Sequence, residues 1–325
     1  MRLLIISDNL QMLLIKEALR YSLSSSFAMK SLLLFALLGF STALPLQGPS
    51  DIDQELFQNL TKGLIHPSEL VIGGSRAWRG QWPWQAFLQI QSSQGGSFTC
   101  GGSLLTTKYV LTAAHCTANI ASPSYVMVGL ININSASWTP GVQIKKIISF
   151  ATHRDYTGAG ALYNDIAILT LESEVTLSPY VKTVKIQKDD SSLVNTAKDT
   201  VSGFGTYTFQ YGKPVTSPDL LYAEVDHIDL GSCKRRWTKL TGGRTILWDK
   251  QICAGSNGKG SGPGDSGGPL QVNVGGDWVQ IGLVSFGISA VPQMANQAEF
   301  PAVYTRVSSY CDFITKATNG DYKCL

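Results

Sequence analysis

The chain has 325 residues, of which 44% are hydrophobic and 15% are charged, and its formal net charge is +3. This composition is typical of a globular protein with ample material for a core, and the length alone would suggest about two domains. So small a net charge gives no indication of a nucleic-acid partner, and none is expected.

Residues 29–43 have the pattern of a secretory signal peptide. A basic start at Met29-Lys30 precedes an apolar run over residues 31–40 and the small residues Ser41-Thr42-Ala43. The apolar run is too short for a membrane-spanning helix, which needs about 20 residues. Residues 1–28 are interpreted as an extension of the gene model before a true start at Met29, or as a long n-region. We expect a secreted, extracellular protein without membrane association after signal removal.

Residues 44–70 are predicted to be a short propeptide. The segment is weakly periodic and mixes proline with acidic residues, at Pro45, Pro49, Asp51, Asp53 and Glu55. It also contains Asn59-Leu60-Thr61, a sequon for N-glycosylation. No folded domain is expected here.

From residue 85 onward, short β-patterned segments alternate with polar turns, as in an all-β sandwich or barrel. Six strands are predicted in the first half, at Gln85–Gln91, Gly101–Leu105, Tyr109–Thr112, Ser124–Leu130, Gln143–Ile148 and Ile166–Leu171. Six more are predicted in the second half, at Thr200–Phe204, Tyr222–Ile228, Gln251–Gly255, Pro269–Val272, Trp278–Ser285 and Ala302–Val307. The pattern alone leaves sandwich and barrel undecided.

The chain closes with one predicted amphipathic helix over about residues 309–318. Its apolar positions follow the spacing i, i+3, i+4, i+7 and are Tyr310, Phe313, Ile314 and Ala317. Ser309 and Asp312 offer a capping pair at the start of this helix, and Gly320 follows its end.

Three motifs carry residue types used in nucleophilic catalysis. In the turn Gly262–Leu270, Ser266 is preceded by Gly264-Asp265 and followed by two glycines, which would let a substrate carbonyl approach both its hydroxyl and backbone N–H groups. A glycine-rich turn alone is more often an ordinary loop. Here two partners accompany it, Leu111-Thr112-Ala113-Ala114-His115-Cys116 and Asn164-Asp165-Ile166-Ala167-Ile168-Leu169. Together the three motifs resemble the chymotrypsin-like serine protease family, from Val71 to about Lys316.

The resemblance implies that residues 71–325 form one serine protease domain. The implied fold is all-β, with two packed six-stranded antiparallel β-barrels and the C-terminal helix. Barrel 1 would occupy about residues 71–185 and barrel 2 about residues 199–308, with a boundary near residues 186–198. The protein would act as a monomer on protein or peptide substrates, and protein inhibitors are further candidate partners.

The family pattern also implies the catalytic roles. Ser266 would be the nucleophile and His115 its general base, because imidazole titrates near working pH. Asp165 would hold the other ring nitrogen of the histidine. The backbone N–H groups of Gly264 and Ser266 would form the oxyanion hole.

Val71-Ile72-Gly73-Gly74 resembles the N-terminus that this family exposes on activation. Cleavage before Val71 would create an ammonium group for Asp265, since a buried carboxylate is costly without a cationic partner. The uncut chain would then be a zymogen. Leu70 precedes the cut, so the expected activator has chymotrypsin-like rather than trypsin-like specificity.

All six cysteines lie after residue 71, and an even number in a secreted chain predicts disulfides. The count leaves the pairing open. The family pattern implies Cys100–Cys116 and Cys233–Cys253, which leaves Cys311 with Cys324. Gly262 stands where most relatives carry a cysteine that ties the wall of the specificity pocket, so this wall is expected to be looser.

The resemblance places Gly260 at the base of that pocket with Ser261 beside it. Ser285-Phe286-Gly287 would form the strand edge that pairs with the substrate, and Ala302 the opposite wall. None of these residues is a carboxylate, so a P1 Lys or Arg is disfavoured and Phe, Tyr, Leu or Met is expected. An elastase-like preference for small residues is the alternative, against which Gly287 argues because it leaves one wall open.

A non-catalytic binding module with the same fold is the rival function. The triad, the oxyanion turn and the activation terminus favour catalysis, because a binding module needs none of them. No cofactor and no metal is expected, since there is no Cys-x-x-Cys pair and no acidic residue between Val126 and His153. His153 and His227 are interpreted as surface or structural residues, and Lys234-Arg235-Arg236 as a solvated face.

Overall fold

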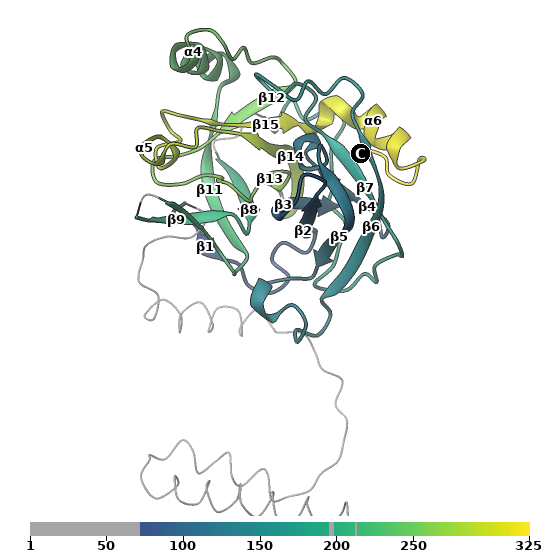
Figure 1. Ribbon diagram of the computed structural model, residues 1–325. Helices are drawn as coiled ribbons and strands as arrows, with labels where there is room; N and C mark the ends of the chain where they lie inside the picture. The colour runs from purple at the N-terminus through teal and green to yellow at the C-terminus, as the bar shows by residue number, and fades with distance from the viewer. Residues whose placement is uncertain (1–71, 195–197, 212) are drawn as a thin grey trace, which may run out of the picture. The chain divides into compact units, whose positions relative to one another are not determined.

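The structure is a computed structural model that describes residues 72–194, 198–211 and 213–325 (Figure 1). The predictions for the extension at residues 1–28, the signal peptide, the propeptide, the sequon at Asn59 and the residue Val71 lie outside this range. None of the helices in the described part is long and apolar enough to span a bilayer.

Two closed antiparallel barrels account for most of the described strands, which confirms the predicted fold. Barrel 1 consists of β2 (Gln85–Ser92), β3 (Ser97–Leu104), β4 (Tyr109–Thr112), β5 (Ile120–Val128), β6 (Gln143–Thr152) and β7 (Ala167–Leu171), in the order β2-β3-β4-β7-β6-β5. Barrel 2 consists of β8 (Lys198–Gly203), β11 (Leu221–Ile228), β12 (Gln251–Ala254), β13 (Pro269–Val274), β14 (Asp277–Phe286) and β15 (Ala302–Arg306), and the pairing of β11 with β8 closes it. The short strand β1 (Ser75–Arg76) pairs with β11.

Strand β2 shows how the alternation of side chains builds two cores at once. Ala86, Leu88 and Ile90 point to one side of the strand and are fully buried inside barrel 1. Phe87 points to the other side, into the cluster between the barrels, where its ring meets the ring of Phe204 edge to face at 5.3 Å. Alternate side chains of β2 therefore fill the interior of barrel 1 and the interface between the barrels.

Buried polar side chains fix the orientation of one barrel against the other. The Trp84 indole N–H donates to Gln271 Oε1 at 2.7 Å, and the Ser202 hydroxyl donates to Gln85 Oε1 at 2.8 Å. Hydrogen bonds are directional and costly to leave unmade in a buried interface. They therefore select one relative orientation of the barrels, which apolar packing alone would specify less sharply.

The structure also contains elements that the sequence patterns did not predict. They are the hairpin of β9 (Thr206–Gln210) and β10 (Lys213–Thr216), the helices α4 (Leu230–Thr241) and α5 (Val291–Met294), and the 3₁₀ turns η1 (Ala114–Cys116), η2 (Ile133–Ser135) and η3 (Val307–Tyr310). Helix α4 begins at Asp229, whose side chain accepts from the Ser232 N–H, and ends at Gly242 with φ of 59°. These end signals are readable in the sequence.

The predicted C-terminal helix is present as α6 (Cys311–Ala317), but its predicted capping pair is wrong. The N-cap residue is Tyr310, whose side chain makes no capping hydrogen bond. Ser309 lies inside the preceding turn η3, so its hydroxyl is one residue too early to cap the helix.

Although α6 follows barrel 2 in sequence, it packs against barrel 1 (Figure 1). Ile314 is fully buried there, and Cys311 forms a disulfide with Cys324. Beyond the helix, the Tyr322 hydroxyl donates to the Val184 carbonyl and the Leu325 N–H donates to the Ile186 carbonyl, both at 2.9 Å. The C-terminal segment thus forms hydrogen bonds with the part of the chain that connects the two barrels.

One buried ion pair holds the connection between the barrels. Asp190 is 3% exposed, and its two oxygens accept from Arg306 Nε at 3.0 and 3.2 Å. Asp190→Asn should lower the free energy of unfolding by about 2 kcal/mol, because Arg306 would keep its partly buried charge without a partner. Urea unfolding followed by tryptophan fluorescence measures this loss.

The matched control is Asp189→Asn at the exposed neighbouring position, which should change the stability by less than about 0.5 kcal/mol. Equal effects of the two substitutions would show that the Asp190–Arg306 pair does not stabilise the connection.

Candidate active site

The pairing of β4 with β7 brings His115 and Asp165 together. Thr112 at the end of β4 lies opposite Ala167 at the start of β7. Because the strands are antiparallel, the residues just after β4 and just before β7 meet at the same end of barrel 1. His115 lies in the turn η1 that follows β4, and Asp165 lies two residues before β7.

The Asp165 carboxylate is fully buried and accepts hydrogen bonds from both barrels. His115 Nδ1 lies 2.8 Å from Oδ2, and the His115 backbone N–H donates to Oδ1 at 2.9 Å. From barrel 2, the Ser285 hydroxyl donates to Oδ2 at 2.6 Å, and the Thr305 hydroxyl donates to the Asp165 backbone carbonyl at 2.9 Å. These bonds hold the ring of His115 with Nδ1 facing the carboxylate, which leaves Nε2 for other chemistry.

Glycine allows the turn that carries Ser266 to press against barrel 1. A Cβ on Gly267, which has φ of 77°, would overlap the Thr112 hydroxyl, and a Cβ on Gly101 would lie 2.9 Å from the Cα of Gly268. The Gly101 N–H donates to the Ser266 carbonyl at 2.8 Å. Side chains at these glycines would force the turn away from the histidine.

Ser266 and His115 are both partly exposed, and no hydrogen bond joins them in the described structure. Such contacts often tighten only when a substrate binds. Within the described residues, the N–H groups of Gly264 and Ser266 also donate to no protein acceptor. Both donors are therefore open to a substrate oxygen.

Asp265 directs its carboxylate into the protein, away from Ser266. It is fully buried and accepts from the Gly205 N–H at 2.8 Å and the Gly262 N–H at 3.0 Å. Side chains at Gly203 or Gly205 would overlap this carboxylate. Burial raises the pKa of Asp265 to about 6, and the two backbone hydrogen bonds offset part of that rise. No cation pairs with it within the described residues.

The six cysteines form three disulfides, which are the two pairs that the family pattern implied and the remaining pair. Cys100–Cys116 joins β3 to the histidine turn, Cys233–Cys253 joins α4 to β12, and Cys311–Cys324 closes the C-terminal segment. Cys100 and Cys116 lie with His115 in the one metal-like cluster of the described residues. Their sulfurs are bonded to each other, so they present no thiolates to a metal.

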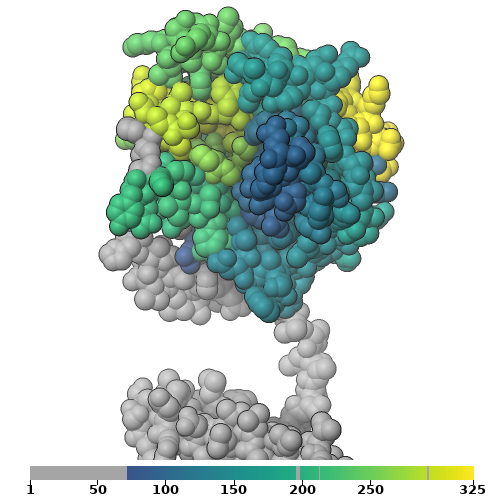
Figure 2. All heavy atoms as spheres, viewed as in Figure 1, coloured from purple at the N-terminus to yellow at the C-terminus, as the bar shows by residue number. Residues whose placement is uncertain are grey.

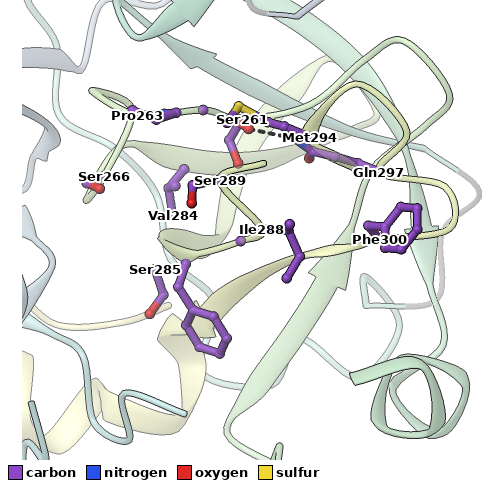
Figure 3. Close-up of a pocket in the computed structure, with 13 residues that line it drawn as sticks. Ser261, Pro263, Ser266, Val284, Ser285, Ile288, Ser289, Met294, Gln297 and Phe300 are labelled. Atoms are coloured by element: carbon purple, nitrogen blue, oxygen red, sulfur yellow. Dashed lines mark hydrogen bonds between the residues drawn. The ribbon is translucent and has the colours of Figure 1, made fainter. Parts of the chain in front are cut away.

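A pocket of about 280 Å³ opens beside Ser266 (Figure 3). Ser266 lies toward one end of it, and Gln297 and Phe300 lie toward the other. The lining residues include no carboxylate and are Ser261, Gly262, Pro263, Ser266, Val284, Ser285, Phe286, Gly287, Ile288, Ser289, Met294, Gln297 and Phe300.

Four of the six residues predicted for the pocket line it, and two lie behind it. Ser261 and the run Ser285-Phe286-Gly287 belong to the lining. Gly260 lies directly behind the carboxamide of Gln297, and Ala302 is buried where it would contact a side chain at position 287, 3.8 Å from a Cβ built on Gly287. The segment between Phe286 and Ala302 therefore supplies more of the lining than was predicted.

Hydrogen bonds hold the pocket wall beside Gly262, the residue that stands where most relatives were expected to carry a cysteine. The Gly258 N–H donates to the Ala295 carbonyl at 2.7 Å, and Gln297 Nε2 donates to the Ser261 carbonyl at 2.6 Å. On the outer side, helix α4 lies beside this segment (Figure 2), and Arg236 donates to the Ala298 carbonyl. The basic run Lys234-Arg235-Arg236 thus has one member that holds the pocket segment.

The two other histidines of the described residues, His153 and His227, do not line the pocket. The side chain of His227 is 8% exposed, and its Nδ1 lies 2.9 Å from Oδ2 of the fully buried Asp199. His153 packs its ring against those of Tyr310 and Phe313. Both therefore have structural contacts.

Several residues of the site were not predicted in their observed roles. The contact of the Ser285 hydroxyl with Asp165 has no local sequence signal, since it depends on how barrel 2 meets barrel 1. Gln297 likewise reaches the pocket through the course of a long loop. For Arg236, the helix signals at Asp229 and Gly242 could have placed the residue on α4.

Comparisons with known proteins agree with this geometry. The trypsin family model matches residues 71–314. Human serine protease 41 is 33% identical over 255 residues, which cover 76% of each chain. A mouse tryptase is 34% identical over 276 residues, 81% of this chain and 96% of its own, and trypsin delta of Drosophila erecta is 32% identical over 238 residues, 73% of this chain and 84% of its own. The chain belongs to the trypsin family of serine proteases.

Proposed function

We propose that this protein is a secreted endopeptidase that cleaves after large apolar residues by an acyl-enzyme mechanism. The Ser266 hydroxyl attacks the scissile carbonyl carbon while His115 Nε2 takes its proton, and the N–H groups of Gly264 and Ser266 bind the oxyanion. The C–N bond then breaks as the histidine returns the proton to the leaving amine. Water hydrolyses the acyl-enzyme by the same proton transfers, and Asp165 stabilises the imidazolium each time.

The pocket beside Ser266 is the observation that carries the proposed specificity. Its volume of about 280 Å³ and its side chains Val284, Phe286, Ile288, Met294 and Phe300 suit a large apolar P1 residue. A buried lysine or arginine would find no carboxylate among the lining residues, which makes it costly.

The precursor would be activated by cleavage before Val71, whose new ammonium group would pair with Asp265. Two observations support this proposal. Asp265 is a fully buried carboxylate held by backbone N–H groups alone among the described residues. Ile72, the first described residue, donates its N–H to the carbonyl of Thr206 at 3.4 Å, next to Gly205 of the carboxylate cradle.

Secretion is supported by the signal-like residues 29–43 and by the three disulfides, which form in oxidising compartments. Protein and peptide substrates follow from the family. The signal would be removed before the precursor is cut.

The first test is hydrolysis of a peptide set that differs only at P1, with protein cut to expose Val71. Cleavage should follow Phe, Tyr, Leu and Met, and should be at least about 100-fold slower after Lys or Arg. The Ser266→Ala variant should cleave none of them. Cleavage only after Ala or Val would favour the elastase-like alternative, and no cleavage with the Val71 terminus verified would favour the binding module.

The second test concerns Asp265 in the uncut precursor. Its pKa is raised on folding, so the unfolded chain loses this proton at lower pH than the folded chain does. The free energy of unfolding should therefore fall by about 3 kcal/mol as pH rises from about 3 to about 7. Thermal midpoints of an uncut Ser266→Ala precursor across this range measure the fall.

In the same background, Asp265→Asn should remove this pH dependence, whatever its effect on the baseline. Cleavage before Val71 should also remove it, because the ion pair would favour the charged carboxylate. If the uncut precursor and its Asp265→Asn variant show the same pH slope, burial of the Asp265 charge does not destabilise the precursor.

The third test addresses Ser285, a positioning residue that acts through Asp165. Ser285→Ala removes a hydrogen bond to a buried carboxylate and should lower kcat about tenfold with KM changed less than about twofold. Ser285→Thr keeps a hydroxyl and should restore part of the loss. A change confined to KM would instead assign Ser285 to substrate binding alone.

A further inference from the structure

The residue before the proposed activation cut determines which protease can make that cut. Leu70 precedes Val71 in the sequence, and the two lie just before the described residues, which begin at Ile72. A protease whose pocket pairs a lysine or arginine with a carboxylate gains nothing from leucine at P1. The activator must therefore have a pocket that accepts a large apolar side chain.

The pocket of this protein meets that requirement (Figure 3). Its volume is about 280 Å³, and its lining includes the apolar side chains of Val284, Ile288 and Phe300 but no carboxylate. A leucine side chain would bury its apolar surface against these walls and leave no polar group unpaired. The same property that disfavours a basic P1 residue therefore makes Leu70 a suitable one.

The sequence around the cut favours an extended backbone, the form in which a peptide can pair with the edge of a strand. Pro67 interrupts any helix that would run through it, and Val71 and Ile72 are β-branched residues that favour strands. On the enzyme side, Gly287 follows Phe286, the last residue of β14, and its backbone groups form no hydrogen bond with other described residues. This edge is therefore open to an extended segment of a second chain.

The cut after Leu70 is the one that would leave an ammonium group beside Asp265. The Ile72 N–H donates at 3.4 Å to the carbonyl of the residue after Gly205, and Gly205 itself donates to the Asp265 carboxylate at 2.8 Å. An ammonium group on Val71 would lie one residue from this anchor. A cut farther upstream would leave extra residues between the ammonium group and Ile72.

We propose that the activated protein is the activator of its own precursor, so that the partner in the activation step is a second copy of this chain. The proposal rests on the proposed function above and names a substrate for it. The Ser266 hydroxyl of the active copy attacks the carbonyl carbon of Leu70 in the precursor while His115 takes the hydroxyl proton. The Leu70–Val71 C–N bond then breaks, the histidine passes its proton to the Val71 amine, and water releases the acyl group from Ser266. The leaving group is thus the amine that would pair with Asp265.

This route makes activation self-accelerating, because every cut produces one more activator. Pure precursor should therefore convert with a lag, and added activated protein should shorten that lag in proportion to its amount. A precursor that its own product cannot cut would convert at a rate independent of added product.

The substrate for the direct test is a full-length precursor with Ser266→Ala, which cannot cut itself. Activated protein is prepared from a Leu70→Lys precursor with immobilised trypsin, since both forms begin at Val71 after the cut and are then identical. A small amount of this activated protein should convert the Ser266→Ala precursor to a chain that begins at Val71, as read by N-terminal sequencing. Leu70→Phe in the same background should also be cut.

The matched control combines Leu70→Lys with Ser266→Ala. Activated protein should convert it at least about 100-fold more slowly, because the lysine would enter a pocket without a carboxylate. Trypsin should convert it readily, which shows that the variant is folded and that its cut site is accessible.

Two results would overturn the proposal. In one, the activated protein cleaves peptides after leucine but leaves the Ser266→Ala precursor uncut. In the other, Leu70→Lys makes no difference to the rate of conversion. Absence of all peptide cleavage would overturn the proposed function and this proposal with it, so the two failures are distinguished.

Discussion

The fully buried carboxylate of Asp165 is the constraint on which the rest of the site depends. An ion taken out of water must have its lone pairs satisfied, and here the donors come from His115 in barrel 1 and Ser285 in barrel 2. The barrels must therefore meet in one way for the charge to be tolerated. Ser285 also lines the pocket together with Phe286 and Gly287, so the end of β14 that donates to the Asp165 carboxylate also forms part of the pocket lining.

Asp265 is a second fully buried carboxylate, and it differs from Asp165 in its hydrogen-bond partners. Two backbone N–H groups donate to its carboxylate, which lies against Gly203 and Gly205. Burial nevertheless raises its pKa, because these two hydrogen bonds do not offset the full cost of removing the charge from water. Asp165 is paired with a histidine, whereas Asp265 has no cation among the described residues. Of these two buried acids, only Asp265 has no cationic partner among the described residues.

The sequence pattern predicted the strands because side-chain alternation is a local signal, whereas their closure into two barrels was implied only by the family resemblance. Alternation in segments such as β2 fixes which side chains enter the barrel, and all twelve predicted barrel strands overlap observed ones. Helix α4 was not predicted, although Asp229 and Gly242 mark its ends. The short β9–β10 hairpin and the true N-cap of α6 depend on tertiary placement. Gln297 could not have been predicted at all, since nothing near residue 297 indicates that a loop held by α4 returns its carboxamide to Gly260.

Gln297 shows that the residues identified by a family motif do not describe the whole pocket, because it lines the pocket and lies outside the motif. The motif places residue 260 at the base of the pocket. This residue is glycine, so the motif alone predicts a base without a side chain. A glycine there does more than remove a side chain, because it opens a space that another part of the chain can enter. Here the carboxamide of Gln297, from the long loop, fills that space. The same amide donates a hydrogen bond to the Ser261 carbonyl, next to Gly262, where most relatives were expected to carry a cysteine. One side chain from the long loop therefore stabilises the pocket wall with its donor and fills the space beside Gly260 with its carboxamide.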